Sequence, residues 1–122
     1  MSRVIHFELP ADNPERVVEF YKKVFGWQIQ KWPGPTDYWL VNTGAEGQPG
    51  INGGILRRQH PSASTCNTVG VASVDDAVAT ITKNGGKNPV PKMPIPGVGY
   101  LAYCTDTEGN VFGVMQPDTN AK

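Results

Sequence analysis

The spacing of apolar and polar residues changes near the start of the chain. Residues 4–9 form a short run of β-forming side chains. Asn13 can cap a helix, and Pro14 suits the first position of that helix. The apolar residues that follow recur at helical spacing and are Val17, Phe20, Tyr21 and Val24. The pattern predicts a strand and then an amphipathic helix that ends at Gly26.

Three strand-like segments follow this helix. Residues 27–30 alternate apolar and polar side chains, and residues 38–43 are rich in β-formers. A glycine-rich turn then leads to a third run at residues 51–56. The first half of the chain therefore has the predicted order strand, helix, three strands.

The second half of the chain repeats this order. Residues 68–72 form a β-like run, Asp75 is the expected helix cap, and Gly85 offers a stop. Two later segments correspond to strands of the first half: 100–105 to 38–43, and 112–115 to 53–56. A strong hairpin signal at residues 106–110 lies between them.

These patterns predict one α+β domain of residues 1–122, built from two βαβββ modules at approximately residues 1–60 and 65–118. Each small sheet would pack one face on its helix and leave the other face free. Pairing the modules would form a curved mixed sheet around a trough between the free faces. A trough of this kind suits a small organic molecule.

Charge, the first residues and the cysteines indicate which partners, location and cysteine chemistry to expect. The 122 residues include eleven basic and eleven acidic ones, so no net field favours nucleic acid or membrane as a partner. The first ten residues lack the apolar run of a secretory signal, and the expected location is cytoplasmic. Cys66 and Cys104 are far apart and are predicted to be buried small hydrophobes.

Three features of the chain belong together: the opening strand with His6, the helix of residues 17–27, and the hairpin of residues 106–113. In combination they resemble the vicinal oxygen chelate superfamily, which contains glyoxalase I, bleomycin-resistance proteins and extradiol dioxygenases. The likeness covers nearly the whole chain and implies a glyoxalase-like member that forms a homodimer.

The resemblance also implies four metal-ligand positions, one on the first strand and one on the last strand of each module. By the internal repeat these positions fall on His6, Gly54, Val69 and Gly113. A divalent ion needs three or four converging donors, and only His6 of the four supplies one. We therefore expect no cofactor and no standard metal centre, although a divalent metal with His6 as a ligand remains an alternative.

The candidate site residues follow from these positions. His6 and Glu8 share a strand face and are the candidate catalytic pair, but a structural pairing of the two side chains explains them equally well. Six further residues are the candidate ligand-binding positions: Asn52, Gly54, Asn67, Lys92, Tyr100 and Gly113. Glycine at two of these positions can mark a bulge or a close backbone approach, and it can also enlarge the trough; the two interpretations are compatible.

The proline-rich residues 89–99 are expected to form an edge strand or a semi-rigid extended loop, because proline cannot donate to a central strand. If this segment crosses the mouth of the trough, Lys92 could meet an anionic group of the ligand. The competing interpretation is a structural connector with a solvated lysine.

Three function classes remain open. The leading hypothesis is a small-molecule-binding protein without the standard metal, acting by sequestration or by a metal-free reaction that involves His6 and Glu8. The alternative is a metal-dependent lyase or isomerase of glyoxalase type. A protein-interaction module is the third, and would need a large exposed apolar patch. Whether the chain is an enzyme is left open by its sequence.

Overall fold

The computed structural model describes residues 2–122, which form two compact units. One unit is residues 6–65, here called the first module. The other, called the second module, is residues 66–122 together with the start of the chain up to Ile5. The predicted α+β class and the two βαβββ modules are confirmed, while the trough between the modules stays a prediction.

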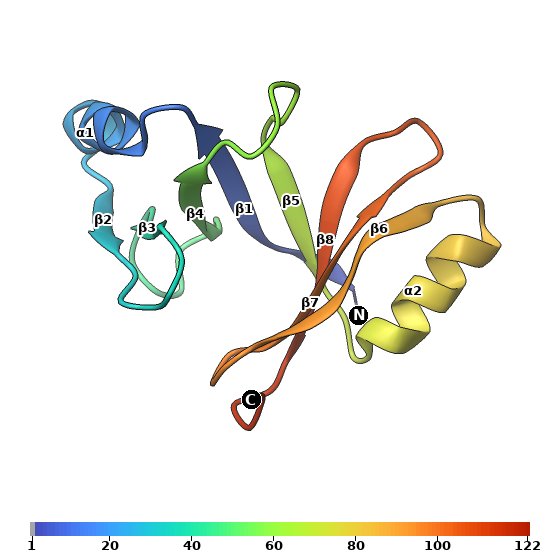
Figure 1. Cartoon of the computed structure of the whole chain (residues 1–122). Coiled ribbons are helices and arrows are strands. Elements are labelled where there is room, and N and C mark those ends of the chain that lie inside the picture. Colours follow the sequence, from blue (N-terminus) through green and yellow to red (C-terminus); the bar gives the residue numbers. More distant parts are fainter. Residues whose placement is uncertain (1) are drawn as a thin grey trace. The chain divides into compact units, whose positions relative to one another are not determined.

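The first module contains one helix and a mixed sheet (Figure 1). Its elements are β1 (Arg3–Ala11), which belongs to this unit from His6 onward, α1 (Pro14–Phe25), β2 (Gln28–Lys31), β3 (Tyr38–Asn42) and β4 (Asn52–Arg57). The strand order is β2-β3-β4-β1. Strand β1 runs parallel to β4, and the other two pairs are antiparallel.

The second module has the same plan (Figure 1). Its elements are β5 (Cys66–Gly70), α2 (Val74–Lys83), β6 (Lys87–Ile95), β7 (Gly99–Thr105) and β8 (Val111–Pro117). The strand order is β5-β8-β7-β6, with β5 parallel to β8 and the remaining pairs antiparallel. Residues 89–95 of the proline-rich segment thus lie in the edge strand β6, whose pairing with β7 shifts register twice, and residues 96–98 form the turn to β7.

Helix α1 begins and ends where the sequence predicts. The Asn13 side chain accepts a hydrogen bond from the Arg16 backbone N–H, and Gly26 adopts φ 71° at the C-terminal cap. One face of the helix packs on the sheet through the buried Val18, in a core that also contains Ile29, Trp39, Val41 and Ile55.

Helix α2 corrects one prediction. Its cap is Ser73, whose hydroxyl accepts from the Asp76 backbone N–H at 3.1 Å, and the helix begins at Val74. Asp75 lies inside the first turn, where a carboxylate favours the positive end of the helix dipole. Val74 of this helix packs with Ala102, Cys104 and Val114 of the sheet in the core of the second module.

The remaining local predictions hold. Asp106 closes the β7–β8 hairpin by accepting from the backbone N–H groups of Glu108 and Asn110. Cys66 and Cys104 are buried and form no disulfide. Across residues 2–122, no helix has the length and apolar content that a membrane crossing would require.

Candidate functional site

The two candidate catalytic residues lie on one face of β1. Phe7 and Leu9 pack into the core below α1, so the alternating His6 and Glu8 point to the opposite face of the sheet. Glu8 is only 8% exposed. Burial lowers the pKa of His6, and the Glu8 carboxylate partly opposes this effect. His6 is therefore a neutral imidazole near pH 7.

Tyr38 on β3 completes this cluster. Its hydroxyl lies 2.7 Å from Nε2 of His6, and the two rings are nearly parallel at 12°. A neutral imidazole nitrogen and a phenol can share one proton across such a distance. The arrangement couples β1 to β3, which are separated in the sheet by β4.

Gly54 makes room for that phenol. Gly54 pairs with Glu8 on one side and with Leu40 on the other. A Cβ atom at position 54 would overlap the hydroxyl and the ring of Tyr38. The Tyr38 phenol thus fills the space that a side chain at position 54 would take, and the ligand role of Gly54 stays a prediction.

Tyr38 was not among the candidate residues predicted from the sequence. It lies two residues from Leu40, the partner of Gly54, and an aromatic ring reaches such a diagonal neighbour. Predicting this contact requires the strand register, which the sequence pattern alone does not supply.

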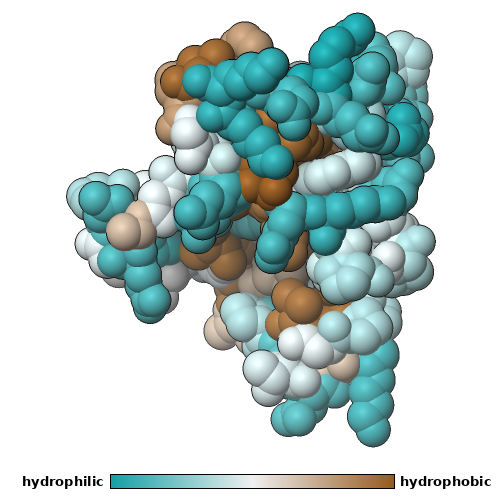
Figure 2. Space-filling view, turned by 90° about the vertical axis from the view of Figure 1, so that its left-hand side faces the viewer, coloured by the Kyte–Doolittle hydropathy of each residue, from teal (hydrophilic) through white to brown (hydrophobic). Residues whose placement is uncertain are grey.

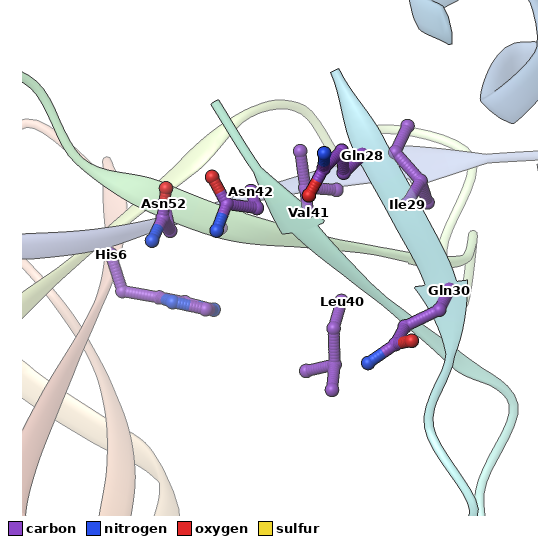
Figure 3. Close-up of a pocket in the computed structure, with 9 residues that line it drawn as sticks. His6, Gln28, Ile29, Gln30, Leu40, Val41, Asn42 and Asn52 are labelled. Carbon is purple, nitrogen blue, oxygen red and sulfur yellow. The ribbon is translucent and has the colours of Figure 1, made fainter. Parts of the chain in front are cut away.

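A pocket of about 420 Å³ lies beside this cluster in the first module. Its lining residues are His6, Gln28, Ile29, Gln30, Leu40, Val41, Asn42, Asn52 and Gly53. In Figure 3, the side chains of His6, Leu40 and Gln30 extend to the same side of the strands. None of the nine residues carries a formal charge when His6 is neutral, and four of them are carboxamides.

The second module holds the other candidate ligand residues on two different faces. Gly113 pairs with Thr68 and with Tyr103, on the face opposite the helix. A Cβ at position 113 would lie 3.1 Å from the Thr68 hydroxyl. Asn67 is exposed and pairs with Phe112, which packs on the core below α2. The ligand roles of Gly113 and Asn67 stay predictions.

Tyr100 and Lys92 meet on the helix side of the second module. Tyr100 packs against the core that contains Cys104, whereas Tyr103 takes the opposite face. The Lys92 ammonium forms an ion pair with Asp75 at 3.0 Å and lies 5.4 Å from the centre of the Tyr100 ring. The predicted meeting of Lys92 with an anionic ligand would have to displace this exposed ion pair, and stays a prediction.

The corrected helix cap changes the comparison of the two modules. Counted from the caps Asn13 and Ser73, the position of His6 corresponds to Cys66 and that of Glu8 corresponds to Thr68. The strand pairings support this correspondence, since Glu8 pairs with Gly54 in the first module and Thr68 pairs with Gly113 in the second. Val69, the position that the sequence analysis assigned, instead packs against the core below α2.

The side chains present do not fit the standard metal site that the resemblance implies. Within residues 2–122, no three His, Cys, Asp or Glu side chains converge as a metal site requires. His6 Nε2 is engaged by Tyr38, and the space at Gly54 is filled by the same phenol. A metal with one or two of these donors would lack the rest of its protein ligands.

The sequence of this chain is similar to known sequences. Residues 3–44 match the family described as bleomycin resistance protein-like N-terminal. A glyoxylase-like domain-containing protein of Didymella fabae is 27% identical over 119 residues, covering 93% of this chain and 92% of the relative.

Two solved structures share the fold at low sequence identity. A hypothetical protein from Bacillus halodurans C-125 has a TM-score of 0.73 at 10% identity, covering 99% of this chain and 98% of its own. A variant of methylmalonyl-CoA epimerase from Streptomyces coelicolor, in complex with 2-nitronate-propionyl-CoA, has a TM-score of 0.69 at 15% identity. That match covers 93% of this chain and 95% of the epimerase.

Proposed function

We propose that the chain is a glyoxalase-like member of the vicinal oxygen chelate superfamily and that it binds a small organic molecule without the standard metal centre. The binding serves either to sequester the molecule or to hold it for a metal-free reaction. The observation that carries the proposal is the pocket of about 420 Å³ on the first module, with His6 in its wall. Its volume lies within the usual range of small-molecule sites.

The chemistry available in this pocket is proton transfer and hydrogen bonding. Neutral His6 can accept a proton, and its contact with the Tyr38 hydroxyl offers a path by which that proton is shared. The Glu8 carboxylate beside it favours the imidazolium that would form. These groups support a base role for His6 and a positioning role for Glu8.

Binding at this pocket can be tested by NMR on the 15N-labelled full chain with a panel of small organic molecules. We expect amide shifts that cluster on the pocket residues and disappear in Leu40→Lys, which places a charge in the pocket wall. Val90→Lys is the matched control, because Val90 and Leu40 are exposed to 39% and 38%. Absence of any clustered shift across the panel would contradict the proposal.

The second candidate is a metal-dependent lyase or isomerase of glyoxalase type. It is favoured by one observation, since the imidazole of His6 and the carboxylate of Glu8 lie on the same strand face. Metal analysis of protein purified without chelators separates the two candidates. Near-stoichiometric zinc, nickel, manganese or iron that is lost in His6→Ala would replace the first proposal with the second.

A further inference from the structure

Two carboxamides at the rim of the pocket have their oxygens fixed by the backbone. The Oδ1 atom of Asn42 accepts from the Gly44 N–H at 3.0 Å. The Oδ1 atom of Asn52 accepts from the Thr43 N–H at 2.9 Å. Both donors belong to the turn that follows β3.

These hydrogen bonds determine which way each amide group faces. A backbone N–H can be paired only with the carbonyl end of an amide, so the NH₂ end must point away from the turn. Figure 3 shows the nitrogens of Asn42 and Asn52 turned toward the side of the strands on which His6 and Leu40 lie. The pocket therefore has two oriented donors on adjacent strands, β3 and β4.

We propose that Asn42 and Asn52 recognise an acceptor oxygen of an uncharged, carbonyl-bearing ligand. The inference rests on the proposed function and adds the chemical class of the ligand to it. Two NH₂ groups can donate to the lone pairs of one carbonyl oxygen, and Leu40 offers an apolar contact to the carbon frame beside it.

The lining of the pocket favours a neutral ligand over an anion. No lysine or arginine is among its nine residues, and burial holds His6 in the neutral form. A carboxylate would lose hydration there without gaining a charged partner. A ketone, ester or amide oxygen has a smaller desolvation cost and is satisfied by neutral donors.

Three probes of similar ring size separate these ligand classes: cyclohexanone as a neutral carbonyl, tetrahydropyran as a weaker ether acceptor, and cyclohexanecarboxylate as an anion. Each is titrated into the 15N-labelled full chain while the side-chain NH₂ signals of Asn42 and Asn52 are followed. We expect cyclohexanone to shift both pairs of signals and to bind more tightly than the other two probes.

Asn42→Asp and Asn52→Asp test the donors directly. Each variant keeps an oxygen for its backbone N–H partner and replaces the NH₂ donor with a second, negatively charged carboxylate oxygen, which cannot donate to a carbonyl. Each is expected to weaken cyclohexanone binding at least about fivefold, the equivalent of one hydrogen bond. Asn13→Asp is the matched control, because its oxygen caps α1 by accepting from the Arg16 N–H and it does not line the pocket.

The outcomes distinguish this inference from the proposed function. Pocket binding that is unchanged in both aspartate variants, or that prefers tetrahydropyran or cyclohexanecarboxylate, overturns the carbonyl assignment and leaves the binding site standing. If no probe and no member of the wider panel shifts the pocket residues, the binding site itself is overturned. Thermal melts of all three variants, expected to match the wild type within a few degrees, show that affinity and not folding has changed.

Discussion

Gly54 has no side chain, and this leaves room for the Tyr38 phenol in the candidate site. Gly54→Ala would place a methyl group into the Tyr38 phenol, so we expect a loss of about 1–3 kcal/mol in the free energy of unfolding. Urea denaturation measures this loss. Gly44→Ala is the control, because its Cβ would meet only the end of the flexible Gln48 side chain at 3.0 Å.

The same contact can be checked by a double-mutant cycle. Tyr38→Ala removes the overlapping ring, so adding Gly54→Ala to that variant should cost much less than it does in the wild type. Equal costs in the two backgrounds would show that the phenol does not occupy the space beside Gly54.

The lowered pKa of His6 predicts a dependence of stability on pH. The folded pKa lies below the ordinary value of 6.5, so the unfolded chain binds more protons as the pH falls through 6.5 towards the folded pKa. The free energy of unfolding should therefore decrease as the pH falls from 6.5 towards the folded pKa of His6. Above pH 6.5, protonation of His6 should no longer change the free energy of unfolding.

Urea titrations between about pH 5 and 8 measure this slope. His6→Gln is expected to reduce it. His60→Gln changes the other histidine of the chain and leaves the contribution of His6 in place. A His6→Gln variant with the full wild-type slope would contradict the assignment.

At the scale of elements, helix α2 depends on a cap that the sequence analysis placed two residues too late. Ser73→Ala removes the hydroxyl that accepts from the Asp76 N–H, and we expect it to cost about 1 kcal/mol. Asp75→Ala should cost less, because it removes a dipole contribution and an exposed ion pair with Lys92. Thermal unfolding of the two variants compares them, and a larger loss in Asp75→Ala would contradict the assigned cap.

The structure of strand β6 could be predicted only in part from its prolines. The prolines correctly restricted this segment to an edge or an extended loop. They could not choose between the two, because the choice depends on the pairing of β6 with β7. They also could not show that Lys92 would lie beside Asp75, which is seventeen residues away in sequence.

At the scale of the whole molecule, we expect a symmetric homodimer. Helix α1 presents Phe20, Val24 and Phe25 with 55%, 52% and 61% of their surface exposed. Figure 2 views the chain from the side that carries α1, where hydrophobic residues interrupt a hydrophilic surface. An exposed apolar face of this kind is typical of a subunit contact.

Sedimentation at micromolar concentration tests the dimer against the chain mass of 13.2 kDa. Val24→Glu should dissociate it, whereas Val111→Glu should not, although the two valines are exposed to 52% and 51%. A wild-type protein that sediments only at the mass of one chain rules out the dimer.

The sequence by itself determined the α+β class, the two modules, helix α1 and the β7–β8 hairpin, because these follow from periodicity, caps and turn residues that act over a few positions. It also identified His6 and Glu8 as neighbours on one strand face. Only the tertiary structure decided that Tyr38 lies against His6 and fills the space beside Gly54. That contact joins residues distant in sequence, and it depends on strand register and side-chain packing, which no local pattern encodes.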